Sequence, residues 1–265
     1  MAIILPGLVG VFLYLTGAVL QFSGIVRRQL PDRTLIRAIA VAAALAHAWL
    51  VWQLMFADVL DLGLFRVATL VTLTMVVLIL ASSFNRPLDN LFVVLFPVAA
   101  LSLTLALVFD AHYLPPDSLG PGFAAHVILA VLAYAVLAVA VCQSLVVGWQ
   151  ESQLRARQRL TLLASLPPLQ TMERLLFELL WTGLILLTLA IASGFLFLDD
   201  MFAQRVVHHT VLSIASWVVF AILLAGRHRL GWRGPTAIRW TLGGFAMLML
   251  AYFGSKLVIE VILGD

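Results

Sequence analysis

Histidine is the residue type in this 265-residue sequence best suited to chemistry, because a neutral imidazole binds metal ions and titrates near neutral pH. His126, His208 and His209 stand where two long apolar segments begin, at what we expect to be a similar membrane depth. Neutral imidazoles at equal depth on two helices could bind one metal ion axially, and haem iron is such a metal. The sequence therefore predicts that His126 binds haem iron together with His209 or His208.

The other histidines have simpler interpretations beside the functional one. His47 lies inside an apolar segment, roughly 13 Å below its end at 1.5 Å per residue. A polar group at that depth is a functional candidate, although a hydrogen bond to a neighbouring helix would also satisfy it. We expect His112 to lie in a loop at the membrane interface, and His228 to belong to an arginine cluster. One of His208 and His209 could likewise cap its helix while the other faces lipid headgroups.

Other metals and reactions have less support. Zinc needs three or four protein ligands, and the nearby carboxylates lie in loops without tight ligand spacing (Asp110, Asp117, Asp199 and Asp200). The single cysteine, Cys142, excludes a disulfide within the chain and a CxxC redox pair. No nucleophile elbow, phosphate-binding loop or HExxH motif occurs. We therefore expect a protein without enzymatic activity of its own, with any chemistry supplied by a cofactor.

Long apolar segments position these residues. The chain is 63% hydrophobic and 11% charged, whereas soluble domains carry about a quarter charged residues. The apolar segments are long enough to cross a bilayer as helices, and they lack the alternation of membrane strands. We predict an all-α polytopic transmembrane bundle, one integral membrane domain over 1–265. Its eight spans cover about 3–25, 35–56, 67–84, 91–109, 123–148, 175–197, 207–226 and 240–262.

The basic residues predict the orientation of the bundle. All of the 16 Lys and Arg residues except Arg66, Arg205 and Lys256 fall in connections on one face of this model. Cytoplasmic loops retain Lys and Arg, so both termini are expected on the outer side, the periplasm in a Gram-negative host. The first segment lacks a basic region before it and is followed by Arg27 and Arg28, so it is not expected to be a cleaved signal peptide. The net charge of +3 reflects this topology and gives no reason to expect a nucleic-acid partner.

Four stretches carry a family resemblance. They are HVILAVLAYAVLAVAV from His126, LPPLQTMERLLFELLWTGLILLTLAIASG ending at Gly194, SWVVFAILLAGR ending at Arg227, and GWRG from Gly231. Together they resemble the cytochrome c assembly superfamily of haem-handling membrane proteins (CcsA, ResC and CcmC), and within it the HemX/YpjD-like inner-membrane branch. The resemblance implies that His126 is an external haem ligand. It also implies that the small residues Gly183, Ala190 and Gly194 allow close helix packing.

The sequence departs from the family pattern in three places. In the register fixed by Trp217 and Arg227, the family's tryptophan-rich loop falls on residues 206–210, which include both His208 and His209. Ala225 stands where the family has a transmembrane histidine, and no histidine follows near the C-terminus. His47 could match the family's other transmembrane histidine. The resemblance therefore implies His208 or His209 as substitute ligands, and it gives little support for direct attachment of haem to a cytochrome.

Together, these features predict a multi-pass protein of the bacterial inner membrane that binds non-covalent, b-type haem near the outer leaflet. The expected ligands are His126, His208 or His209, with His47 in a deeper site. The alternative is an adaptor that keeps the family fold without haem and stabilises an integral membrane partner in the lipid bilayer. An electron carrier of the cytochrome b type is disfavoured because the inner half offers only His228. A transporter has weak support from Pro97, Glu178 and Glu260.

Overall fold

The computed structural model describes residues 4–27, 32–57, 60–86, 88–109, 112–114, 120–156, 167–197 and 207–257. These residues form helices and short connections, and no strand occurs among them. The chain divides into two compact units. Unit 1 comprises Met1–Pro115 with Gln153–Pro167, and unit 2 comprises Pro116–Ser152 with Pro168–Asp265. Each unit is described by itself below, and the single domain expected from the sequence stays a prediction.

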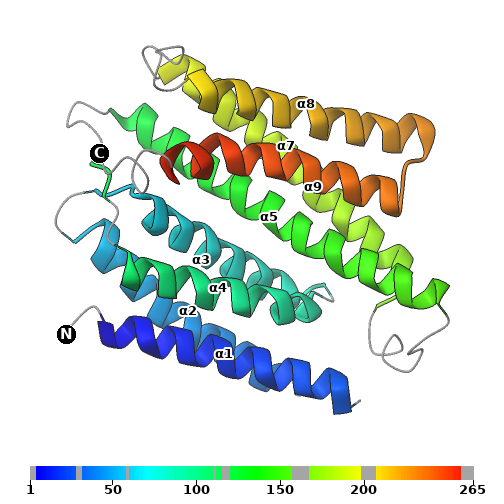
Figure 1. The fold of residues 1–265 in the computed structure, drawn as a ribbon, viewed down its shortest axis with the longest axis horizontal. Helices are drawn as coiled ribbons and strands as arrows, with labels where there is room; N and C mark the ends of the chain where they lie inside the picture. The colour runs from blue at the N-terminus through cyan, green and yellow to red at the C-terminus, as the bar shows by residue number, and fades with distance from the viewer. Residues whose placement is uncertain are drawn as a thin grey trace. The chain divides into compact units, whose positions relative to one another are not determined.

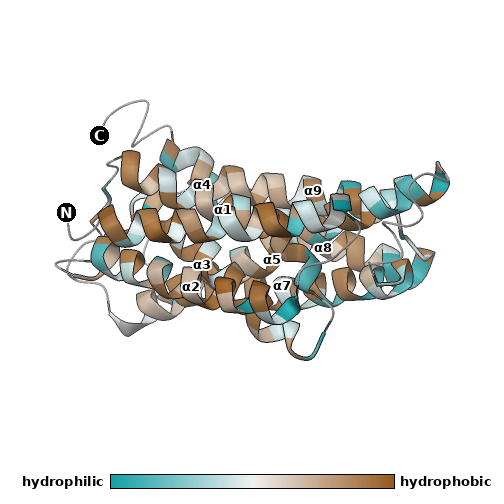
Figure 2. Cartoon of the chain, turned by 90° about the horizontal axis from the view of Figure 1, so that it is seen from below, coloured by the Kyte–Doolittle hydropathy of each residue, from teal (hydrophilic) through white to brown (hydrophobic). Residues whose placement is uncertain are grey.

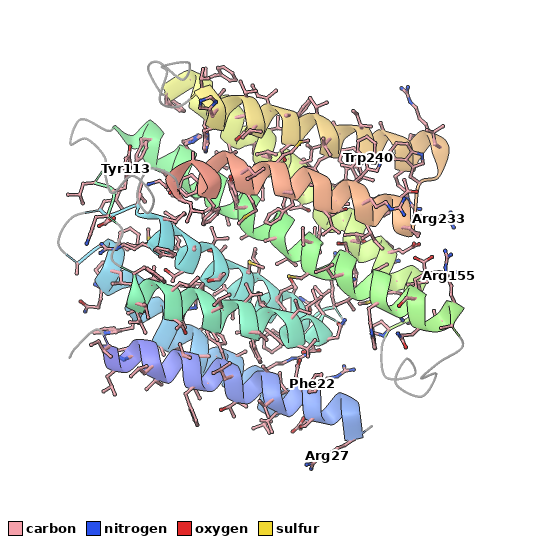
Figure 3. The ribbon with its side chains drawn as sticks, viewed as in Figure 1. Phe22, Arg27, Tyr113, Arg155, Arg233 and Trp240 are labelled. Carbon is pink, nitrogen blue, oxygen red and sulfur yellow. The ribbon has the colours of Figure 1, made fainter. Side chains whose placement is uncertain are left out.

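Unit 1 is built on four long helices: α1 (Ile4–Arg27), α2 (Arg33–Met55), α3 (Leu64–Ser83) and α4 (Phe92–Val108), with the short η1 (Asp89–Leu91) before α4. Helix α1 packs against α2 and α4, and α3 packs against the same two helices (Figure 1). Stacked Phe92 and Phe96 rings, with centroids 4.9 Å apart, are fully buried in this bundle. Tyr113, beyond α4, lies at the opposite end of unit 1 from Arg27 (Figure 3).

Polar contacts fix the connections of unit 1. The Asp32 carboxylate caps α2 by accepting from the Thr34 backbone N–H at 3.0 Å. At the same end, the Arg37 guanidinium donates two hydrogen bonds, of 2.8 and 3.0 Å, to the Asp89 carboxylate. It also donates to the Ser83 carbonyl at 2.6 Å. A bidentate pair of this kind has a fixed geometry. It therefore joins α2 to both ends of the connection between α3 and α4.

Unit 2 contains α5 (Pro121–Arg155, whose last three residues fall in unit 1), α7 (Leu169–Phe197), α8 (Val207–Leu230), α9 (Pro235–Met249) and the π-helical η2 (Leu250–Gly254). Helix α8 packs against α7, α9 and η2. A Cβ at Gly183 of α7 would come within 2.4 Å of the Leu137 side chain on α5. Glycine is therefore needed for the close approach of these two helices, as the small-residue pattern predicted.

Eight helices within the described residues are long and apolar enough to cross a membrane. The stretches that qualify are Ile4–Gly24, Arg33–Met55, Leu64–Ser83, Asp89–Val108, Gly122–Arg155, Leu169–Phe197, Val207–Leu230 and Pro235–Gly254. Hydrophobic residues dominate the middle of the helices, and hydrophilic ones gather toward helix ends (Figure 2). The predicted all-helical class and span count are thus confirmed. The main difference is in α5 and α7, which extend farther toward their shared connection than the predicted 123–148 and 175–197.

Candidate functional site

His126 lies in the first turns of α5 and contacts the last turns of α7. Its Nδ1 is 2.9 Å from the Ala190 carbonyl oxygen and 3.2 Å from the Ser193 hydroxyl. A carbonyl oxygen can only accept, so Nδ1 carries the proton and donates it. Because neutral imidazole has one N–H, the Nε2 atom then presents a lone pair. That arrangement, with a backbone carbonyl holding the far nitrogen, is typical of histidines that bind metals.

His208 and His209 occupy different environments although they are adjacent at the start of α8. His208 is exposed, whereas His209 is half-buried. The His209 ring meets the Tyr252 ring edge-on, with centroids 6.0 Å apart and planes at 77°. Of the two adjacent histidines, His209 is therefore the one whose ring packs against η2, at the same end of unit 2 as His126.

An aromatic cluster lies beside His209. Tyr252 and Phe253 belong to η2, and Tyr134 of α5 meets their rings at centroid distances of 6.3 and 5.9 Å. The Tyr134 hydroxyl donates to the Leu248 carbonyl, and the Ser255 hydroxyl donates to the carbonyls of Ala251 and Tyr252. These bonds satisfy backbone oxygens around the widened turn. Such π-helical turns are frequent at functional sites. No sequence motif marks this cluster, so it was not among the predicted site residues.

The arrangement suits a metal cofactor that itself supplies most of the ligands to its metal. No group of three or more His, Cys, Asp or Glu side chains that could hold a metal ion occurs in the described part of the chain. Zinc therefore lacks a protein ligand set there. Haem needs only axial ligands from the protein, because the porphyrin supplies the rest. Two imidazoles on separate helices next to an apolar aromatic surface fit that requirement.

His47 is in unit 1 and is fully enclosed. Its side chain is 0% exposed, and its Nδ1 is 3.1 Å from the Tyr14 hydroxyl on α1. The Tyr14 ring meets the imidazole edge-on at 5.8 Å and is itself packed against Phe96. The buried Nε2 makes no hydrogen bond of ordinary geometry to a described residue, although the Thr69 backbone on α3 lies close to it. The deeper haem site predicted at His47 stays a prediction, and ligand access there requires this packing to open.

His112 belongs to a charged cluster in unit 1. Its Nδ1 is 2.7 Å from the Asp61 carboxylate, which also pairs with Arg66 and accepts from the backbone N–H groups of Gly63 at 2.9 Å and Tyr113 at 3.0 Å. Burial alone raises the pKa of the Asp61 carboxyl, but the hydrogen bonds from Tyr113, His112 and Gly63 and the charge of Arg66 outweigh it, so this pKa lies below its usual value. The cluster ties the residues before α3 to the connection that follows α4.

The GWRG motif builds the opposite end of unit 2. Gly234 has φ +55° and its N–H donates to the Glu173 carboxylate at 3.0 Å. A Cβ at Gly226 would meet the Trp232 ring at 2.4 Å, so glycine lets the loop fold back onto α8. The Arg227 guanidinium lies 4.5 Å from the Phe177 ring centroid and donates to the Trp232 carbonyl at 3.2 Å. Arg233 and Trp240 lie at this end (Figure 3). The motif therefore has a structural role here.

Known proteins identify the family. The model of the family described as "Cytochrome C assembly protein" matches residues 35–263. The chain belongs to this family. It is similar to the Inner membrane protein YpjD of Escherichia coli K12, at 32% identity over 203 residues covering 76% of each chain. It is also similar to an uncharacterized 28.8 kDa protein of Azospirillum brasilense, at 36% identity over 141 residues and 52% of each chain. No solved structure matches the chain.

Membership of the family confirms the resemblance in the four sequence stretches. Together with the eight apolar helices of the described residues, it makes the chain a multi-pass membrane protein. Several residues named from the sequence lie outside the described residues: Arg28, Asp110, Asp117, Asp199, Asp200, Arg205, Val206 and Glu260.

Proposed function

We propose that this protein binds and handles haem in cytochrome c biogenesis, in the bacterial inner membrane. His126 and His209 would bind the iron of a non-covalent, b-type haem. The site lies near the outer leaflet, with both termini on that side, if the arginine-rich end of unit 2 is cytoplasmic. His208 faces away from the site. Family membership and the 32% identity to an inner membrane protein support the proposal.

The observation that carries the proposal is the hydrogen bond from His126 Nδ1 to the Ala190 carbonyl. It fixes the tautomer and the ring orientation, and it makes Nε2 the more basic, metal-binding nitrogen. A histidine that merely faced lipid headgroups would not need this contact on another helix. His209, held edge-on against Tyr252, brings the second imidazole to the same end of unit 2.

The residues of the chain act by binding and orienting the ligand. Haem, when bound, supplies an iron centre that accepts two axial nitrogens. Ser193 donates to the Ala190 carbonyl at 2.8 Å and stands beside His126 Nδ1, so it supports the anchor. Tyr252 and Phe253 offer an apolar surface that limits water around a flat macrocycle.

An optical spectrum with a pyridine-haemochrome assay tests the proposal, on protein purified in mild detergent from haem-replete cells. We expect near-stoichiometric b-type haem with a bis-histidine spectrum. His126→Ala and His209→Ala should lose this spectrum, whereas His208→Ala is the matched control on the adjacent, exposed residue. A parent protein that is colourless and takes up no added haem contradicts the proposal.

An adaptor that keeps the fold without haem is the second candidate function. The enclosure of His47 favours it, since this histidine is packed as a core residue in the described structure. Ala225, in place of the family's transmembrane histidine, points the same way. Stoichiometric co-purification of a colourless protein with one integral membrane partner would support the adaptor.

A further inference from the structure

Lys256 places a positive charge at the histidine end of unit 2. Its Nζ lies 5.5 Å from the centroid of the Tyr252 ring, which is the ring that meets His209. Tyr252 is thus in contact with both the proposed ligand His209 and a cation. Lys256 is partly exposed, as is common for lysines near helix ends, whose long side chains extend toward the membrane surface.

The position of this charge is unusual within its unit. Among the described Lys and Arg residues of unit 2, the others lie in α7 before the membrane core or in the last turn of α8 and beyond, at the arginine-rich end: Arg174, Arg227, Arg229, Arg233 and Arg239. Lys256 is also one of the three basic residues that the sequence pattern does not assign to the cytoplasmic connections. Topology therefore does not explain its placement, because the positive-inside rule favours the other end.

We propose that the Lys256 ammonium binds an anionic carboxylate of the ligand held by His126 and His209. The inference rests on the proposed function, since it names the part of the ligand that Lys256 recognises. Haem carries two propionate side chains on one edge of an otherwise apolar macrocycle. A cation beside Tyr252 lets the carboxylate edge point toward the membrane surface while the apolar edge faces the aromatic cluster. Lys256 is then a binding residue that sets the orientation of the ligand.

A lipid phosphate offers the same anionic chemistry. Lysines near helix ends commonly extend toward headgroups and pair with them. The experiment must therefore distinguish a ligand carboxylate from a lipid phosphate.

The test combines two ligands with three proteins in nanodiscs of neutral lipid, and repeats the measurements in nanodiscs of anionic lipid. The ligands are haem and its dimethyl ester, in which both carboxylates are neutral. The proteins are the parent, Lys256→Gln, and Lys256→Arg, which keeps the charge. Titration of the Soret band gives each dissociation constant. We expect Lys256→Gln to weaken haem binding by about tenfold, as for loss of one charge-assisted hydrogen bond. The variant should bind the ester as the parent does, and Lys256→Arg should recover most of the haem affinity.

Three results overturn the inference. Equal haem affinity of Lys256→Gln and the parent shows that the charge does not act on the ligand. Equal weakening for haem and ester shows a general structural effect. A Lys256→Gln effect that occurs only in nanodiscs of anionic lipid, and as a loss of thermal stability alone, assigns Lys256 to headgroups. If the parent binds neither ligand, the proposed function itself fails, and this result is distinct from the first three.

Discussion

The two units hold imidazoles in contrasting ways. In unit 2, the half-buried His126 donates a hydrogen bond from Nδ1 to the Ala190 carbonyl, which leaves a lone pair on Nε2. In unit 1, His47 is 0% exposed and is enclosed by Tyr14 and the rings behind it. Both are histidines in apolar helices, yet only His126 is partly exposed and donates to the backbone of another helix. The difference makes His126 the better candidate for a ligand, because histidines that bind metals usually donate their far N–H to such a group.

Replacement of His126 should have the largest effect on haem binding. His126→Ala removes a proposed iron ligand, and we expect haem affinity to fall by at least roughly a hundredfold, because loss of a supporting residue around a metal ligand alone costs about 10–100-fold. Haem titration of the purified variant measures this. His208→Ala, one residue from His209, is the control. Unchanged affinity in His126→Ala would place the ligand elsewhere.

The reverse pattern is expected for His47. His47→Ala opens a cavity in a closed core and leaves the Tyr14 hydroxyl unpaired, so the free energy of unfolding should fall by about 2–4 kcal/mol. Haem bound at His126 and His209 should stay as in the parent. Denaturation in detergent followed by tryptophan fluorescence, beside haem titration, separates the two effects. Loss of haem from a folded His47→Ala protein would instead support the deeper site predicted from the sequence.

His112 extends the comparison to a third environment, an exposed histidine paired with a buried carboxylate. The pKa of Asp61 is lowered in the folded protein, so its ionised form contributes stability that is present above the usual carboxyl pKa and is lost as pH falls through the lowered value. We expect residues 112–114 to lose hydrogen-exchange protection in that acid range. Asp61→Asn should show reduced protection at neutral pH and little further change on acidification. An identical acid profile in both proteins would contradict this role of Asp61.

Tyr14→Phe should have the smallest effect. It removes one interhelical hydrogen bond to His47 and keeps the ring that packs on Phe96. Hydrogen bonds between membrane helices contribute about 0.6 kcal/mol on average. We expect a loss of stability near that value and no change in haem affinity. A large loss of stability would mean that the hydrogen bond from Tyr14 contributes more to the burial of His47 than the surrounding packing does.

The histidine pair could be predicted only in part. Residue spacing placed His126 and the His208–His209 pair at the starts of two spans, because span boundaries follow from apolar length. Adjacent helical residues point about 100° apart, so only one of His208 and His209 can face the bundle. Which one does so depends on the packing of α8 against η2. The sequence alone leaves both alternatives open.

The Asp61 cluster shows a different limit. His112 was expected at an interface, and Asp61 and Arg66 carried no motif. Asp61 and His112 are 51 residues apart in the chain, yet their side chains are 2.7 Å apart. The pairing arises because α3 and α4 pack side by side and bring their connections together. No local pattern reports a contact over that separation.

The sequence by itself determined the helical class, the eight spans and the family, because hydrophobic length and local motifs are properties of neighbouring residues. Tertiary structure alone decided that His209 faces Tyr252, that the Ala190 carbonyl holds His126, and that Tyr14 and its neighbours enclose His47. Each of these depends on which helix faces are in contact. Between apolar helices, the close packing of small and large side chains determines which faces are in contact, and a single sequence does not reveal that packing.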